Sequence, residues 1–129
     1  MLDTVGLIAV WDEDDQWHDP ASRVYHQLIR SGTVLWTTSF VLAECGNAAA
    51  RRPYRGAVGR LLDQLEKTGD LVFPTDDDWD AACTAYRQGE AGGAGIVDQI
   101  SFAVMRRLGV TRAFTNDRHF RAAGLEPLF

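Results

Sequence analysis

Short apolar runs alternate with segments of helical character along this chain, and this alternation constrains the fold more than any other feature. The runs with the composition of buried strands are Met1–Asp3, Thr33–Thr37, Leu71–Phe73 and Val110–Thr115. The segments expected to be helical are Thr4–Trp11, Ala21–Arg30, Phe40–Arg52, Gly56–Thr68, Trp79–Arg87, Val97–Leu108 and Arg118–Ala123. Alternating strands and helices favour parallel pairing with helices covering the sheet. We therefore predict an α/β fold of three layers, with a mainly parallel central sheet flanked by helices.

Local signals set the expected ends of several helices. Pro20 is a favoured first helical residue, and Ser39 is a residue type that caps helices. The Asp76–Asp78 run suits the start of the helix that follows it. The glycine-rich segment Gly89–Gly95 predicts a flexible loop, and it lacks the strand and lysine of a phosphate-binding loop. Asp117 is expected to cap the last short helix.

The size and composition of the chain favour one globular domain over residues 1–129. Hydrophobic residues make up 46% and charged residues 24%, which excludes a disordered or collagen-like chain. Its longest apolar stretches fall short of the ~20 residues that cross a bilayer, and no signal peptide precedes them. We therefore expect a soluble cytoplasmic protein with no membrane partner. Cys45 and Cys83 form no CxxC pair and are expected to be buried free thiols.

The net charge of −5 is unevenly distributed along the chain. One acidic run covers Asp12–Asp15, and a second covers Asp76–Asp78 and Asp80. Removing these eight charges from the net −5 leaves +3 for the other residues. Twelve of the thirteen basic residues are arginine, which suits bidentate contacts to phosphate. A GC-rich genome would produce the same bias, so both explanations stay open.

Four acidic residues lie where the predicted strands end or the helices begin. Asp3 ends the first run and Asp117 follows the last one, while Glu44 and Asp98 lie in the early turns of two helices. In open parallel sheets, ligands bind beyond the carboxyl ends of the strands. Each acid also has a local explanation, since Asp98 and Asp117 suit helix caps, Glu44 suits a solvated helix face and Asp3 suits a turn.

The surroundings of Asp3 and Glu44 favour a shared role for these acids. Both residues have mainly apolar neighbours in the sequence, and carboxylates in such surroundings are almost never buried unpaired. No lysine or histidine lies close in sequence to pair with them. Two carboxylates ~4 Å apart repel by about 4 kcal/mol at an effective dielectric constant of 20. Converging acids therefore favour a divalent cation, and oxygen ligands favour Mg²⁺ or Mn²⁺ in a site that handles phosphates.

The motifs that contain these acids resemble those of the PIN-domain ribonucleases, and in particular of the small VapC-type toxins of bacterial toxin–antitoxin pairs. The matching segments are "DTVGLIA" from Asp3, "FVLAE" ending at Glu44, "GIVDQISFAVMRRLGV" around Asp98 and "AFTNDRHF" around Asp117. The resemblance covers essentially the whole chain. The last two motifs are specific in combination, whereas the first is weak alone.

The resemblance implies a parallel sheet flanked by helices, and endonucleolytic cleavage of single-stranded or structured RNA that depends on Mg²⁺ or Mn²⁺. By position, Asp3, Glu44, Asp98 and Asp117 would be the catalytic and metal-binding acids. Thr4 and Thr115 would support them by orienting a ligand or water. It further implies a homodimer and a small antitoxin that occludes the site. The helices expected at Phe40–Arg52 and Gly56–Thr68 would form the groove for this antitoxin.

Two features depart from the family pattern. Only Met1 and Leu2 precede Asp3, where family members have several residues, which leaves the anchoring of the first strand open. The segment before Asp98 is also unusually rich in glycine. Neither departure removes an acid. We predict that His119 contacts RNA rather than acting as a general base.

The rivals of the nuclease fall into two classes: an idle PIN module, and a different α/β phosphate enzyme of the phosphatase or receiver type. A catalytically idle PIN module that binds RNA or a protein partner is the alternative, although its usual sign, the loss of one acid, is absent. A phosphatase of the haloacid-dehalogenase type needs an Asp-x-Asp pair, but Asp3 is followed by Thr4 and Val5. A response-regulator receiver needs a late lysine, and Lys67 is the only lysine.

Overall fold

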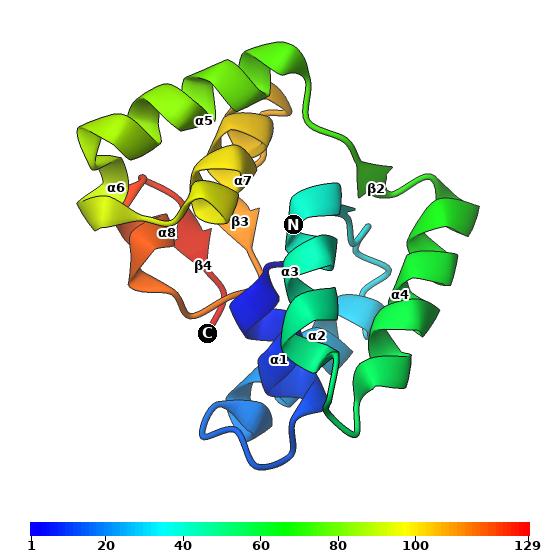
Figure 1. The fold of residues 1–129 in the computed structure, drawn as a ribbon. Helices are drawn as coiled ribbons and strands as arrows, with labels where there is room; N and C mark the ends of the chain where they lie inside the picture. Colours follow the sequence, from blue (N-terminus) through cyan, green and yellow to red (C-terminus); the bar gives the residue numbers. More distant parts are fainter.

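The computed structural model describes residues 1–129 and contains eight helices and four short strands (Figure 1). The helices are α1 (Thr4–Trp11), α2 (His18–Arg30), α3 (Ser39–Ala49), α4 (Arg55–Thr68), α5 (Asp76–Gln88), α6 (Glu90–Gly93), α7 (Ile96–Arg107) and α8 (Arg118–Ala122). The strands are β1 (Thr37–Thr38), β2 (Leu71–Val72), β3 (Arg112–Ala113) and β4 (Glu126–Pro127). No helix is long and apolar enough to cross a membrane.

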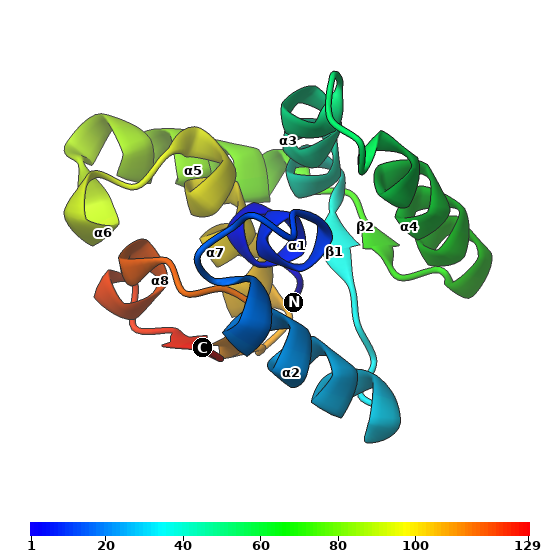
Figure 2. The same cartoon turned by 90° about the horizontal axis from the view of Figure 1, so that it is seen from below.

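The strands pair in parallel, as predicted, but the sheet is reduced to short ladders. β1 pairs with β2, and β3 pairs with β4, both in parallel. Leu2 lies between the two pairs and forms a parallel bridge with Phe114. Figure 2 shows the result, with β1 and β2 on one side of the N-terminus and β4 on the other. The order of segments is therefore β2, β1, Leu2, β3 and β4.

The segment around Leu2 is held by hydrogen bonds to both of its neighbours. The Leu2 amide donates to the carbonyl of Trp36 at 2.7 Å, and the Thr37 hydroxyl donates to the Leu2 carbonyl at 2.7 Å. On the other side, the Phe114 amide donates to the carbonyl of Met1 at 2.8 Å. Leu2 is buried. These hydrogen bonds anchor the segment before Asp3 between β1 and β3.

The predicted strands are longer than the observed ones for reasons that lie in tertiary pairing. Val34 is exposed, and Thr33–Trp36 forms no regular ladder, so β1 comprises only Thr37 and Thr38. The last predicted run, Val110–Thr115, is likewise reduced to Arg112 and Ala113 with a bridge at Phe114. β4 was not predicted, because its Glu-Pro sequence carries no strand signal and its position depends on β3.

Several helix boundaries also differ from the prediction. α2 begins at His18, so Pro20 is its third residue rather than its first. Thr38, not Ser39, is the N-cap of α3, and its hydroxyl accepts a hydrogen bond from the Val41 amide. α3 ends at Ala49, before the expected Arg52, where the following Pro53 disfavours helical geometry. Thr75 caps α5, whose first turn contains the predicted aspartate run.

The glycine-rich segment is an ordered turn rather than the flexible loop that we predicted. It contains the short helix α6 and three successive residues in the left-handed region, Ala91, Gly92 and Gly93. Side-chain hydrogen bonds from α7 and α8 hold this turn in place. These donors are distant in sequence from most of the turn, and composition alone therefore gives no indication of them.

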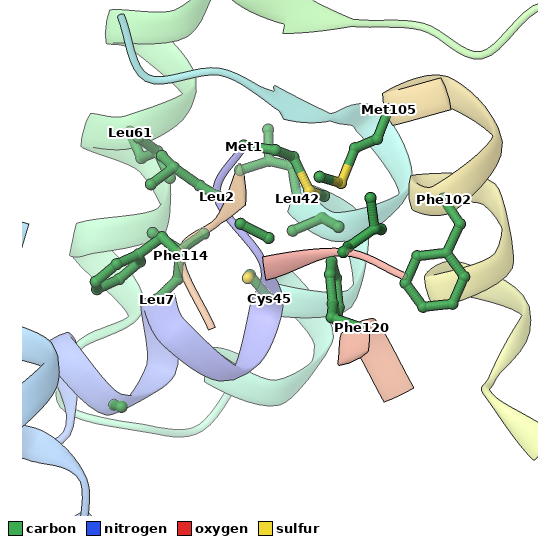
Figure 3. Close-up of a cluster of buried hydrophobic side chains, with 14 of the residues drawn as sticks. Met1, Leu2, Leu7, Leu42, Cys45, Leu61, Phe102, Met105, Phe114 and Phe120 are labelled. Atoms are coloured by element: carbon green, nitrogen blue, oxygen red, sulfur yellow. The ribbon is translucent and has the colours of Figure 1, made fainter. Parts of the chain in front are cut away.

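The helices pack around one main hydrophobic core. α5 packs along α7, and α1 contacts both α2 and α3. Figure 3 shows Leu2, Leu7 and Phe114 together near α1, with Phe102 and Phe120 farther toward α7. The rings of Phe102 and Phe120 meet edge to face, with centroids 4.9 Å apart. Burial of this cluster, which also contains Cys45, is the main favourable term that fixes the arrangement of the helices.

Gly6 allows α1 to lie directly against the segment that follows β3. A Cβ atom at Gly6 would lie 2.1 Å from the carbonyl oxygen of Phe114, so any other residue would push the two segments apart. This contact brings the first turn of α1 close to Thr115. The sequence of α1 therefore determines how the first acid meets the end of the third strand.

Candidate active site

The four acids predicted from the sequence lie on four elements that converge beyond the strand ends. Asp3 is the N-cap of α1, and Asp117 is the N-cap of α8. Glu44 lies in the second turn of α3, and Asp98 in the first turn of α7. The negative charges of these residues are close enough to act on one another. The charge of Asp98 raises the pKa of Asp3, and the charges of Asp117 and Glu44 raise the pKa of Asp98. The fold thus brings all four acids into one cluster.

Asp3 is the most buried member of this cluster, with only 2% of its surface exposed. Desolvation by burial, together with the nearby charge of Asp98, raises its pKa to about 7. The hydroxyl of Thr115 donates to Asp3 Oδ2 at 2.8 Å, and the Val5 amide donates to the same oxygen at 3.3 Å. These hydrogen bonds favour the charged carboxylate and limit the rise in pKa.

Two threonines orient the acidic groups. Thr115 is fully buried, and besides donating to Asp3 its hydroxyl accepts a hydrogen bond from the Asp117 amide at 3.1 Å. Thr115 therefore connects two of the acids. The hydroxyl of Thr4 donates to Glu44 Oε2 and so connects the first turn of α1 with α3. Both threonines that the resemblance indicated thus lie in direct contact with the acids.

Asp98 and Asp117 are half-buried, and each is held by a backbone amide. The Gly95 amide donates to Asp98 Oδ2 at 3.1 Å, and the His119 amide donates to Asp117 Oδ1 at 2.8 Å. Desolvation, with the charges of Asp117 and Glu44, raises the pKa of Asp98 to about 6. Asp98 and Asp117 therefore do act in helix capping, as their local explanation in the sequence predicts. The capping bonds do not remove the repulsion between the carboxylates.

Glu44 differs from what its apolar neighbours suggested, because its side chain is exposed. Val41 and Cys45 point into the core, whereas Ala43 and Glu44 lie on the outer side of α3. Cys45 is free and buried, as predicted, and burial raises the pKa of its thiol to about 12. The other cysteine, Cys83, is free but only half-buried.

None of the four acids forms an ion pair. The two salt bridges of the structure join Arg107 to Asp78 and Arg112 to Glu126, outside this cluster. The cluster therefore carries uncompensated negative charge, and its donors are all hard oxygens, which suit Mg²⁺ or Mn²⁺ better than Zn²⁺. No three His, Cys, Asp or Glu side chains are already grouped closely enough to hold one ion. The donor chemistry fits such a cation, and the side chains would have to draw together to bind it.

Two contributors to the site were missed in the sequence. These are the amide of Gly95, which binds the Asp98 carboxylate, and the amide of His119, which binds Asp117. A signal was present in both cases. Gly95 lies three residues before Asp98, which is the spacing of a capping box, and His119 lies two residues after Asp117, as in an Asx turn.

Comparisons with known proteins identify the family and support the fold. The model of the PIN domain family matches residues 1–125. Among the solved structures that match is the crystal structure of VapC20 from Mycobacterium tuberculosis, a toxin that cleaves the sarcin–ricin loop. The TM-score is 0.79 and the sequence identity 25%, and the match covers 96% of this chain and 94% of that chain. A comparison with curated protein sequences gives no match.

Proposed function

This chain belongs to the PIN-domain family, and from that premise we propose that it is a metal-dependent endoribonuclease, the toxin of a type II toxin–antitoxin pair. The observation that carries the proposal is the convergence of four acids without any ion pair at the ends of parallel strands. A purely structural cluster of this kind would be unfavourable, because each additional negative charge raises the cost of ionising the others.

We propose that Asp3, Glu44, Asp98 and Asp117 hold Mg²⁺ or Mn²⁺ and are the catalytic acids. When bound, such a cation neutralises charge on a scissile phosphate and lowers the pKa of water. The residues of the chain contribute the geometry. Thr115 holds Asp3 through its hydroxyl, Thr4 holds Glu44, and the Gly95 and His119 amides hold the other two carboxylates.

The substrate that we propose is single-stranded or structured RNA in the cytoplasm. VapC20 cleaves the sarcin–ricin loop, and this makes a structured RNA a good first substrate to test. Arg118 and Arg121 on α8 lie close in sequence to Asp117, and Arg118 is exposed. Arginine side chains near the acids would attract the phosphate backbone that the acidic cluster itself repels.

We also propose two protein partners. The first is a small antitoxin that covers the site and occupies a groove formed by α3 and α4, which pack against each other. The second is another copy of this chain. The exposed aromatic residues Phe40, Phe73 and Trp79 support the homodimer, because Phe40 and Trp79 stack at 5.7 Å on the surface and offer an apolar contact.

The test is cleavage of an RNA that contains a sarcin–ricin loop by the purified protein, free of any antitoxin, with Mg²⁺, with Mn²⁺ or with EDTA. Asp98→Asn removes one charge from the cluster, and Asp77→Asn removes an exposed aspartate from the start of α5 as a matched control. We expect cleavage that requires the cation, is lost in Asp98→Asn and persists in Asp77→Asn. If the folded protein binds this RNA without cutting it under either cation, the idle PIN module is the correct function.

A further inference from the structure

The turn that precedes Asp98 has, at Ala91, a backbone conformation that its sequence does not favour. Ala91, Gly92 and Gly93 have φ values of 52°, 71° and 79°. A left-handed conformation is unfavourable for a residue with a side chain, such as Ala91, because its Cβ crowds the following carbonyl oxygen. The turn therefore needs contacts from outside to hold it.

Two side chains supply these contacts. The Gln99 amide donates to the carbonyl of Glu90 at 2.9 Å, and Nδ1 of His119 lies 2.9 Å from the carbonyl of Ala91. Because a carbonyl oxygen only accepts, Nδ1 of His119 carries the proton in this hydrogen bond. The imidazole also packs over the turn, since a Cβ at Gly92 would lie 3.6 Å from Nδ1.

His119 has a second contact, which links the turn to the acids. Its backbone amide donates to Asp117 Oδ1 at 2.8 Å, so the residue that holds Asp117 also holds the turn. The turn leads directly to Gly95, whose amide donates to Asp98 Oδ2 at 3.1 Å. His119 thus binds Asp117 through its backbone amide, and its imidazole binds the turn that leads to the partner of Asp98.

We propose that His119 is a positioning residue that sets the separation of Asp98 and Asp117. This proposal rests on the proposed function, because it concerns the same acids. Nδ1 of His119 is used inside the protein, so the RNA contact predicted for this residue is left to Nε2. The hydrogen bond between the imidazole and Ala91, 28 residues away in sequence, fixes α6 against α8. In this way it fixes Asp98, which follows α6, relative to Asp117, the N-cap of α8.

The experiment compares His119→Ala, which removes the donor, with His119→Asn, whose amide can replace Nδ1 as a donor to Ala91. His26→Ala is the matched control, because His26 is exposed on α2. Two quantities are measured on each folded protein: the NMR shift of the Gly95 amide, and the affinity for Mn²⁺ by electron paramagnetic resonance. The first reports the support of Asp98 without any metal, and the second reports the cluster.

We expect His119→Ala to shift the Gly95 amide resonance and to weaken Mn²⁺ binding by about 10-fold or more, as removal of outer-sphere partners does. His119→Asn should restore both to near the wild-type values, and His26→Ala should change neither. An unchanged Gly95 resonance in folded His119→Ala would overturn the positioning role. A different outcome is that the wild-type protein binds no Mn²⁺ but the Gly95 resonance still differs between wild type and His119→Ala. The proposed metal site is then wrong, although His119 does hold the turn before Gly95. In that case the link has no carboxylates to position for a metal, and the positioning proposal fails with the site.

Discussion

The first turns of α5 and α7 each contain an aspartate that binds the amide three residues before it, yet the two carboxylates have opposite electrostatic surroundings. Asp78 accepts from the Thr75 amide at 2.9 Å, and Asp98 accepts from the Gly95 amide at 3.1 Å. Asp78 also forms a salt bridge with Arg107, whose Nε and Nη2 lie 2.9 and 2.8 Å from Asp78 Oδ2. Asp98 forms no salt bridge, and the charges of Asp117 and Glu44 raise its pKa more than His119 lowers it.

The pKa values of the two aspartates follow this difference. Desolvation acts to raise the pKa of Asp78, but hydrogen bonds from Arg107 and Thr75 outweigh it and lower the pKa below its ordinary value. Desolvation and neighbouring charge raise the pKa of Asp98 to about 6. α7 carries both halves of the comparison, because Asp98 lies at its start and Arg107 at its end. The same local motif thus holds an aspartate in a salt bridge at the start of α5 and an aspartate without a salt bridge at the start of α7.

The largest expected effect separates the two aspartates by activity. We expect Asp98→Asn to lower the rate of RNA cleavage by a factor of about 10² or more, equivalent to about 2.7 kcal/mol of transition-state stabilisation. Asp78→Asn should leave the cleavage rate of the folded fraction within a few-fold of wild type, because Asp78 lies outside the cluster. Equal losses in both variants would contradict the assignment. Initial rates on one RNA substrate, corrected for the folded fraction, decide the question.

Removal of Asp78 should have the larger effect on stability. Asp78→Ala deletes a buried carboxylate, its bond to the Thr75 amide and its contacts with Arg107, and we expect a loss of about 2 kcal/mol in the free energy of unfolding. Asp98→Asn should change it by less than about 1 kcal/mol, since the substitution also removes repulsion. Urea denaturation followed by circular dichroism measures both. A more destabilised Asp98→Asn would mean that its cap matters more than its charge.

Added Mn²⁺ should stabilise the folded protein by binding at the cluster that contains Asp98. At ten times its dissociation constant, a ligand that binds only the folded state adds about 1.4 kcal/mol to the free energy of unfolding. We expect this gain in the wild-type protein and in Asp77→Asn, and a smaller one in Asp98→Asn at the same Mn²⁺ concentration. Thermal unfolding with and without EDTA measures the gain. The same increase in Asp98→Asn would place the cation elsewhere on the acidic surface.

The smallest expected effect is a difference in pH dependence without metal. The folded pKa of Asp98 is raised above its unfolded value, so the unfolded state loses its proton first and stability falls as the pH rises from about 4 through 6. For Asp78, whose folded pKa is lowered, stability is instead lost as the pH falls through that pKa. Asp98→Asn should reduce the loss between pH 5 and pH 8 by about 1 kcal/mol, allowing for solvent screening. Parallel stability curves for wild type and variant would contradict this.

The comparison also shows which parts of the molecule can be predicted from sequence. The positions of the four acids at strand ends and in early helix turns could be predicted, because the local pattern of apolar residues indicates where strands and helices lie. The parallel pairing of the sheet was predicted for the same reason. The bonds of Asp78 and Asp98 to the amides three residues before them were missed, although their spacing is that of a capping box.

Contacts between distant residues account for what could not be predicted. Arg107 and Asp78 are 29 residues apart, and His119 and Ala91 are 28 residues apart, so no local pattern indicates that they meet. The short strands and β4 likewise depend on which backbone groups face each other after folding. The exposure of Glu44 depends on which side of α3 faces the core, and the largely apolar sequence around Glu44 does not reveal that side.

The hydrogen bond between Thr115 and Asp3 spans 112 residues, and this has a consequence for protein synthesis. During translation Asp3 is synthesised 112 residues before Thr115, and Asp117 follows Thr115. The acidic cluster therefore has no complete form on a nascent chain. The site that we propose is therefore complete only once Asp117 has been synthesised, and a shorter nascent chain lacks part of it.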